Sequence, residues 1–386
     1  MRYLTKSRFK LALECPTKLY YTRKPGEYKD TSLDDTFLRA LAWGGYQVGE
    51  LAKHYHPGGV EISSRDYEHS LAETQQYLKS DQVILYEPAI RCKNLFIRVD
   101  ILIKDGNQLQ LIEVKAKSFE SADEFTTKTG KISSKWKEYL YQVAFQKLVL
   151  QHAYPNFKVT SHLLLVDKTK TATVEGLNQR FFIARGSGND IEVIPKNTQD
   201  LGYPILTKVN VDALVEKIWN QPHELQGHVM SFPAYINYLA TCYEKDQPIW
   251  ERVRKECRTC QFRLANPEED GLKSGFHQCW QHMANLKPTD IHRPLTIDIW
   301  DNRRCDNFLA QGWYFQDQID PNDLGNVNET PSKIGLQRVE RQEFQILKSK
   351  DLDPDYYLDR EGLMQEVASI QYPLHFIDFE TTMVPL

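Results

Sequence analysis

The stretch from residue 95 to 117 limits what this chain can fold into more than any other part of the sequence. Its two apolar runs flank an Asp-Gly pair at 105–106, and such a pair between apolar runs is a typical β-hairpin turn. Acidic side chains stand where apolar ones are expected, Asp100 in the first run and Glu113 in the second, and Lys115 follows two residues later. The stretch therefore predicts a hairpin that carries acids within its strands.

This hairpin brings the three charged side chains together. Because strand side chains alternate between two faces, Glu113 and Lys115 project the same way. A turn at 105–106 places Asp100 opposite Glu113 or one step diagonal to it. Two carboxylates this close repel each other unless a cation lies between them, and carboxylate oxygens hold a hard divalent ion such as Mg²⁺. The pattern predicts metal-assisted phosphodiester hydrolysis, and the alternative is a surface hairpin with a salt bridge.

Composition excludes some classes of protein. With 386 residues the chain is long enough for two or more domains. No apolar run reaches the length of a membrane span and the N-terminus lacks the apolar core of a signal peptide, so we expect a cytoplasmic protein with no membrane partner. A net charge of −4 argues against a nonspecific nucleic-acid coat but permits a local basic groove.

Lysines and aromatic residues gather after the hairpin. In this segment Trp136, Tyr139 and Tyr141 either stack on bases or, at helical spacing, belong to the core. The lysines form either a strip that follows a phosphate backbone or a solvated loop, and they are Lys115, Lys117, Lys128, Lys131, Lys135 and Lys137.

Periodicity predicts an alternation of helices and strands around the hairpin. Helices are expected over residues 36–55 and 134–154, and strands over 82–90 and 158–167. Setting aside a polar helix over 66–79, the order is helix, three strands, helix, strand. This order predicts an α/β protein.

The flanking segments add mostly helices. One helix is expected over residues 5–22, interrupted by Pro16, and another over 209–220. Residues 289–370 are polar with a mostly helical pattern. The last segment, YPLHFIDFETTMVPL, is typical of a new apolar strand.

The cysteines indicate a metal centre. Disulfides are not expected in the cytoplasm, whereas Cys257 and Cys260 form a C-x-x-C pair, Cys279 follows, and Cys15 lies far upstream. Four thiolates suit Zn²⁺ or an iron–sulfur cluster, and spacing alone leaves both open. The remaining cysteines are expected to be small core residues, and they are Cys92, Cys242 and Cys305.

The α-β-β-β-α-β order, with Asp100 in the second strand and Glu113-x-Lys115 in the third, resembles the core of the PD-(D/E)XK nucleases. Glu87-Pro88 ahead of Asp100 is similar to the RecB-like branch. The resemblance implies a restriction-endonuclease-like fold. It also implies a Mg²⁺ or Mn²⁺ site in which the Val114 carbonyl joins the two acids, with Lys115 orienting or deprotonating the attacking water.

The same resemblance implies roles for two further residues. A glutamine on the helix after the lysine motif, here Gln142, is expected to position Lys115 or the scissile phosphate. The first core helix of the family carries Gly-x-x-x-His-Glu, which matches residues 45–50. The histidine position is Gly49, and Glu50 remains to supply a third carboxylate and metal ligand.

One cysteine before the core and three after it resemble the iron–sulfur RecB-like nucleases of CRISPR adaptation and of bacterial helicase–nuclease complexes. This implies a [4Fe-4S] cluster, with zinc as the alternative, that closes a nuclease domain over residues 1–285. The gap before the last cysteine is longer than usual in that subset. The implied ligands are Cys15, Cys257, Cys260 and Cys279.

The sequence around Cys279 is similar to a bacterial family that carries a C-terminal exonuclease-like domain. That domain opens with Asp-Phe-Glu-Thr, here residues 378–381. We therefore expect a mostly helical connector over 286–370 and the first strand of a truncated RNase H-like exonuclease domain over 371–386. Because the later carboxylates of such a domain are absent, Asp378 and Glu380 are expected to form an exposed tail.

These features predict a Mg²⁺- or Mn²⁺-dependent nuclease that hydrolyses DNA, as an exonuclease on single strands or ends, with RNA left open as a substrate. A helicase or a defence or repair protein is the expected partner. The alternative is a non-catalytic module of nuclease fold that binds nucleic acid or a partner. Gly49 and the slightly acidic net charge favour that alternative.

Overall fold

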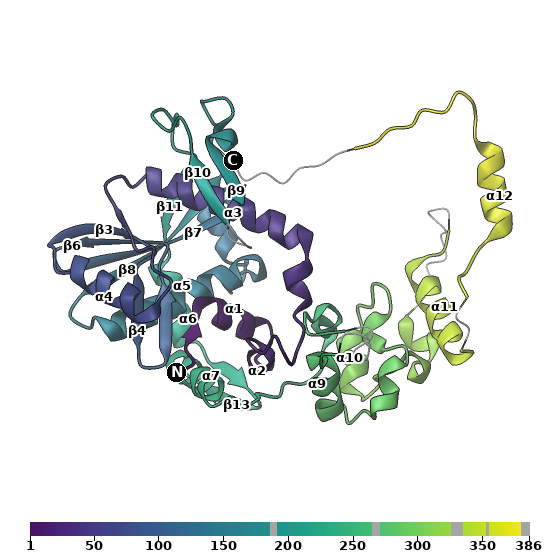
Figure 1. Ribbon diagram of the computed structural model, residues 1–386. Helices are drawn as coiled ribbons and strands as arrows, with labels where there is room; N and C mark the ends of the chain where they lie inside the picture. The colour runs from purple at the N-terminus through teal and green to yellow at the C-terminus, as the bar shows by residue number, and fades with distance from the viewer. Residues whose placement is uncertain (186–190, 265–270, 326–334, 353–354, 380–386) are drawn as a thin grey trace. The chain divides into compact units, whose positions relative to one another are not determined.

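The structure is a computed structural model that describes residues 1–185, 191–264, 271–325, 335–352 and 355–379 (Figure 1). The chain divides into two compact units. Among the described residues, the first comprises Met1–Tyr20 and Ser32–Ile249, and the second comprises Tyr21–Thr31 and the described residues from Trp250 to Phe379. The division therefore falls at Ile249, ahead of the expected boundary at 285.

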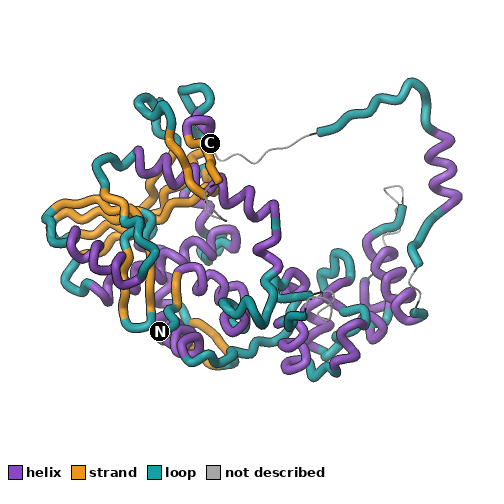
Figure 2. The backbone as a smooth tube through the Cα atoms, in the orientation of Figure 1, coloured by secondary structure: helices purple, strands orange, loops and turns teal. Residues whose placement is uncertain are grey.

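The first unit is a mixed α/β structure around one central sheet, which confirms the predicted α/β class (Figure 2). The central β7 (Gln108–Phe119) runs antiparallel to β6 (Ile101–Asp105) and parallel to β8 (Lys158–Asp167). The strand order across the sheet is β11 (Leu206–Asn210), β8, β7, β6, β3 (Gln82–Tyr86) and β2 (Val60–Glu61).

Helices cover both faces of this sheet, because its strands are apolar on both sides. In β8, Leu163 and Leu165 belong to the core beneath α5 (Ser134–Ala153), whereas Leu164 belongs to the core beneath α3 (Thr36–His54). This alternation has the two-residue period of a strand buried on both faces. The α5 helix joins the parallel strands β7 and β8, as a crossover helix should.

The hairpin from β3 to β6 bends halfway along its length. Its outer part pairs β4 (Ala89–Cys92) with β5 (Leu95–Arg98), and these two strands form a small sheet with β1 (Leu4–Thr5). At the bend the Glu87 amide donates to the carbonyl of Asp100, and Glu87 has a left-handed φ of 53°. Asp100 therefore lies between two strands rather than inside one.

The N-terminal helix of the first unit packs against the crossover helix. Here α1 (Lys6–Glu14) begins after Thr5, whose hydroxyl caps the helix. The Phe9 ring stacks on Phe145 of α5 with centroids 4.8 Å apart. The parallel pairing of Leu4 with Leu95 holds the start of α1 beside β5.

Further elements complete the first unit. An antiparallel pair of strands lies next to α3, and a short hairpin precedes α7. These elements are α4 (Tyr67–Tyr77), β9 (Phe181–Arg185), β10 (Ile191–Pro195), α6 (Asp212–Asn220), β12 (His223–Leu225), β13 (His228–Met230) and α7 (Phe232–Glu244). The short helix α2 (Lys18–Tyr21) spans the division after Tyr20.

The second unit is built from short helices and 3₁₀ turns. Its core includes Phe276, Trp280, Ile297 and Phe315. The 3₁₀ helix η4 (Lys255–Thr259) carries the first cysteine of the C-x-x-C pair. Its α-helices are α9 (Gly275–Met283), α10 (Cys305–Ala310), α11 (Arg338–Lys350) and α12 (Arg360–Ser369).

The strand expected over residues 371–386 does not form in its described part. Residues 371–379 are exposed and have no regular secondary structure, while Glu380 and the residues after it lie outside the described chain (Figure 2). The strand does not form because a single strand without a partner leaves its backbone hydrogen-bonding groups unpaired. Asp378 is exposed, as expected for a tail.

Candidate active site

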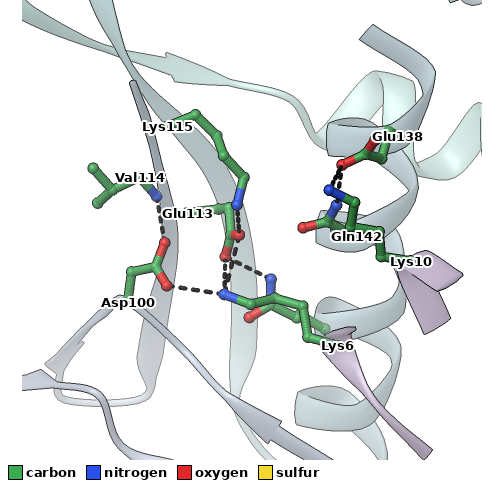
Figure 3. Close-up of polar contacts among 9 residues, drawn as sticks. Lys6, Lys10, Asp100, Glu113, Val114, Lys115, Glu138 and Gln142 are labelled. Carbon is green, nitrogen blue, oxygen red and sulfur yellow. Dashed lines mark hydrogen bonds and ion pairs between the residues drawn. The ribbon is translucent and has the colours of Figure 1, made fainter. Parts of the chain in front are cut away.

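Asp100 and Glu113 lie side by side on one face of the sheet. Ile101 pairs with Ile112, so the next residues outward, Asp100 and Glu113, face each other as the hairpin turn predicted. The Val114 amide donates to Asp100 Oδ2 at 2.7 Å, just beyond the paired part of β6 (Figure 3). The Asp100 carboxylate thus meets a backbone donor where the strand pairing ends.

Glu113 is buried completely, with an exposed fraction of 0%. Lys115 projects from the same face of β7 and its ammonium contacts Glu113 Oε1 (Figure 3). From α5, Gln146 donates its amide to Glu113 Oε2 at 2.7 Å. A buried carboxylate is stable only when its oxygens have such partners.

A second cation, from the N-terminal segment, completes the cluster. The Lys6 ammonium lies 2.9 Å from Asp100 Oδ1 and 3.1 and 3.0 Å from the two oxygens of Glu113 (Figure 3). It reaches them because β1 pairs with β5 and so brings the first residue of α1 beside the bend at Asp100. The cation that the two carboxylates require is therefore supplied by the chain itself.

Burial and charge act in opposite directions on these groups. Burial alone would raise the pKa of Glu113, but Lys115 and Lys6 lower it to about 2. Burial raises the pKa of Asp100, and the charge of Glu113 adds to that effect. Burial would lower the pKa of Lys6, but Asp100 and Glu113 raise it above its ordinary value. Glu113 and Lys6 are consequently charged at neutral pH.

A pocket of about 1180 Å³ opens beside this cluster, lined by residues of α3, β7 and β10 and of the bend at Asp100. Asp100 and Lys115 line it, together with Arg98 and Glu87 from the bend. Burial and the neighbouring Asp100 raise the pKa of Glu87 to about 7. The pocket therefore presents both acidic and basic groups to an incoming molecule.

Glu50 lines the same pocket but lies on α3, which covers the opposite face of the sheet from Glu113. Its carboxylate pairs with Lys53 at 3.1 Å and with His54 at 3.7 Å. The partners of the Glu50 carboxylate therefore lie on its own helix, and Glu50 does not join the pair formed by Asp100 and Glu113.

The glutamine that contacts the acids is one helical turn later than expected. Gln142 donates to Glu138 at 3.0 Å, and Glu138 pairs with Lys10 at 3.0 Å (Figure 3). The contact with Glu113 comes instead from Gln146. The sequence signal for Gln146 is a polar residue within the apolar stretch VAFQKLV. The sequence around Lys6 contains no such feature that would mark it as a partner of the two acids.

The aromatic residues after the hairpin belong mostly to the core. Trp136 is fully buried and Tyr141 is 6% exposed, so neither has a free face for a base. Tyr139 is half-buried, and the ammonium of Lys117 lies 5.4 Å from its ring centroid. Further along, Lys128, Lys131 and Lys135 are exposed, as a solvated loop predicts.

Asp100 and Glu113 offer a divalent ion two carboxylates, and the Lys6 ammonium now lies between them. Across the described ranges, no group of three or more His, Cys, Asp or Glu side chains is arranged to hold a metal ion. Asp100 and Glu113 have the oxygen ligands that Mg²⁺ and Mn²⁺ prefer, and their oxygens converge on one point. That point is occupied by the Lys6 ammonium.

The four candidate cluster cysteines belong to different units. Cys15 follows α1 in the first unit, and the other three lie in the second. The Arg254 amide donates to Cys257 Sγ at 3.5 Å, and the Cys260 amide donates to the Cys257 carbonyl at 3.2 Å. None of the described cysteines forms a disulfide, and Cys305 is buried in the core as expected.

The comparisons with known proteins add no family: no family model, no curated protein and no solved structure matches this chain. No helix among the described residues has the length and apolar character that crossing a membrane requires.

Proposed function

We propose that this chain is a metal-dependent nuclease of the PD-(D/E)XK type that acts on DNA. The observation that carries the proposal is the convergence of Asp100, Glu113 and Lys115 on one face of a hairpin, beside an open pocket. The order α3, β3, β6, β7, α5, β8 supports it, since it matches the element order that the resemblance implies. Lys115 contacts the buried Glu113 and is also one of the residues that line the pocket.

The chain's own residues would act as follows. Glu113 holds the Lys115 ammonium, Gln146 holds Glu113, and Lys115 is one of the residues that line the pocket. From there Lys115 can orient a water molecule or donate a hydrogen bond to a phosphate oxygen. Arg98 lines the same pocket and would contribute positive charge toward a bound phosphate.

A bound Mg²⁺ or Mn²⁺ would supply Lewis acidity toward the phosphate, and its ligands would be Asp100, Glu113 and the Val114 carbonyl. A [4Fe-4S] cluster, with zinc as the alternative, is proposed with Cys15, Cys257, Cys260 and Cys279 as its ligands. It has a structural role and takes no part in hydrolysis.

The second candidate is a non-catalytic module of nuclease fold that binds nucleic acid or a partner protein. Two observations favour it: Lys6 occupies the point between the acids, and Gly49 stands where the family has a histidine. A helicase, or a defence or repair protein, is the partner proposed for either candidate.

One digestion series separates the two candidates. Labelled single strands, blunt duplexes and RNA are incubated with anaerobically purified protein in Mg²⁺, in Mn²⁺ and in EDTA. The proposed nuclease degrades DNA only with metal, and Asp100→Asn abolishes the degradation. Binding without cleavage in every metal would support the non-catalytic module instead.

A further inference from the structure

Neither the hairpin nor any sequence motif predicts that Lys6 lies beside the two acids. Among the described residues, it is the one side chain that donates hydrogen bonds to both Asp100 and Glu113. Its side chain is 21% exposed, whereas Glu113 is fully enclosed. The Lys6 ammonium therefore lies on the solvent side of the cluster and neutralises the two acids.

The oxygens of the two carboxylates are all engaged. Asp100 Oδ1 accepts from Lys6, and Oδ2 accepts from the Val114 amide. Both oxygens of Glu113 accept from Lys6, and each accepts one further hydrogen bond, from Lys115 or Gln146. A Mg²⁺ ion binds carboxylate oxygens at roughly 2.0–2.1 Å, so it cannot bridge the two acids while an ammonium lies about 3 Å from the same atoms.

We infer that Lys6 is an internal cation that locks the site, and that a divalent metal binds the two acids by displacing the Lys6 ammonium. This inference rests on the proposed function and adds a regulatory contact to it. Lys6 is the first residue of α1 and its charge sits on a flexible four-carbon chain, so rotation of the side chain releases the acids without unwinding the helix.

Either cation, the Lys6 ammonium or a divalent metal ion, can neutralise the two carboxylates. With Lys6 in place, two carboxylates face the ammonium groups of Lys6 and Lys115. When a divalent ion replaces Lys6, the acids remain neutralised. When Lys6 is replaced by glutamine and no metal is present, Asp100 and Glu113 lose the cation between them and repel each other. The metal and the lysine are therefore competitors for one place.

Mn²⁺ affinity measured by titration calorimetry tests this competition. Lys6→Gln should bind Mn²⁺ at least about tenfold more tightly than wild type, because no ammonium has to leave. Lys10→Gln is the matched control, since Lys10 lies one turn along α1 and pairs with Glu138 instead. Its Mn²⁺ affinity should equal that of wild type. Adding Glu113→Gln to Lys6→Gln should remove the binding.

A labelling experiment on the wild-type protein avoids any folding defect of the variant. Amine acetylation read by mass spectrometry should modify Lys6 slowly in EDTA and faster in saturating Mn²⁺, with Lys10 modified equally in both. A Lys6 rate that Mn²⁺ leaves unchanged would overturn the inference. So would a folded Lys6→Gln that binds Mn²⁺ no more tightly than wild type.

The two proposals fail separately. If wild type cleaves DNA but Lys6→Gln gains no affinity and Lys6 labelling does not change, the lock is wrong and the nuclease stands. If Lys6→Gln gains Mn²⁺ affinity but no form of the protein cleaves nucleic acid, the lock stands and the nuclease is wrong.

Discussion

Replacing Glu113 removes the group at which the hydrogen bonds of the site meet. Its buried carboxylate accepts from Lys6, Lys115 and Gln146. In Glu113→Gln two ammonium groups lose a counter-charge, and the free energy of unfolding should fall by about 3 kcal/mol. The pKa of Glu113 gives a similar size, because a drop from 4.5 to about 2 corresponds to roughly 3 kcal/mol at neutral pH.

This stabilisation depends on pH with a definite sign. Because the pKa of Glu113 is lower in the folded than in the unfolded chain, its contribution is complete above pH 4.5 and is lost as the pH falls toward 2. The difference in stability between wild type and Glu113→Gln should therefore be largest at neutral pH and shrink in acid.

Urea unfolding followed by circular dichroism measures this difference, at neutral pH and again below pH 4.5. Glu138→Gln is the control, because Glu138 is partly exposed and pairs with Lys10 nearby, so its loss should cost under about 1 kcal/mol. A Glu113→Gln loss as small as that of the control, or one that does not change with pH, would refute the reasoning.

Three further results are expected. Asp212→Asn leaves the buried Lys147 ammonium without a counter-charge and should lower the free energy of unfolding by about 3 kcal/mol, and adding Lys147→Met should recover most of it; equal losses in urea unfolding would contradict this. Glu87→Gln should be more stable than wild type in alkali and equal to it below pH 4.5, since burial and Asp100 raise the Glu87 pKa to about 7; thermal melts that differ by the same amount at every pH would count against it. If Cys257 is a ligand of the proposed iron–sulfur cluster, Cys257→Ala should lose both brown colour and soluble yield; a colourless, folded wild type that contains zinc by elemental analysis would overturn the iron–sulfur proposal.

The local parts of the site were predictable because turn chemistry and strand alternation act over a few residues. The Asp-Gly turn sets the register that places Asp100 opposite Glu113, and alternation places Lys115 beside Glu113. The apolar pattern also predicted α5 and β8 close to their observed bounds. These features required no knowledge of the rest of the fold.

The contacts that sequence reasoning missed depend on pairing between distant segments. Lys6 lies 94 residues before Asp100 and reaches it through a two-residue strand pairing that leaves no periodic signal. Gln142 and Gln146 lie one turn apart on the same face of α5, so the helical pattern alone does not decide which one meets Glu113. The tertiary packing of α5 makes that choice.

The apolar pattern of the sequence also fails to predict short strands at the edge of the sheet. The helix expected from residue 209 begins at Asp212, because residues 206–210 form β11 at the edge of the sheet. With two of its five side chains exposed and polar, β11 has a weak apolar pattern. The tail over 371–379 shows the reverse case, in which an apolar pattern finds no partner strand.

Metal-dependent cleavage by a Lys115 variant tests most directly whether the cluster of Asp100, Glu113 and Lys115 is a hydrolytic site. The rate at which saturating protein degrades an end-labelled single strand in Mn²⁺ is compared between wild type and Lys115→Met, with folding checked by circular dichroism. Wild type should degrade the strand, and the folded variant should show no degradation above an EDTA control. Equal rates for the two proteins, or no cleavage by wild type of any DNA or RNA, would contradict the proposed site.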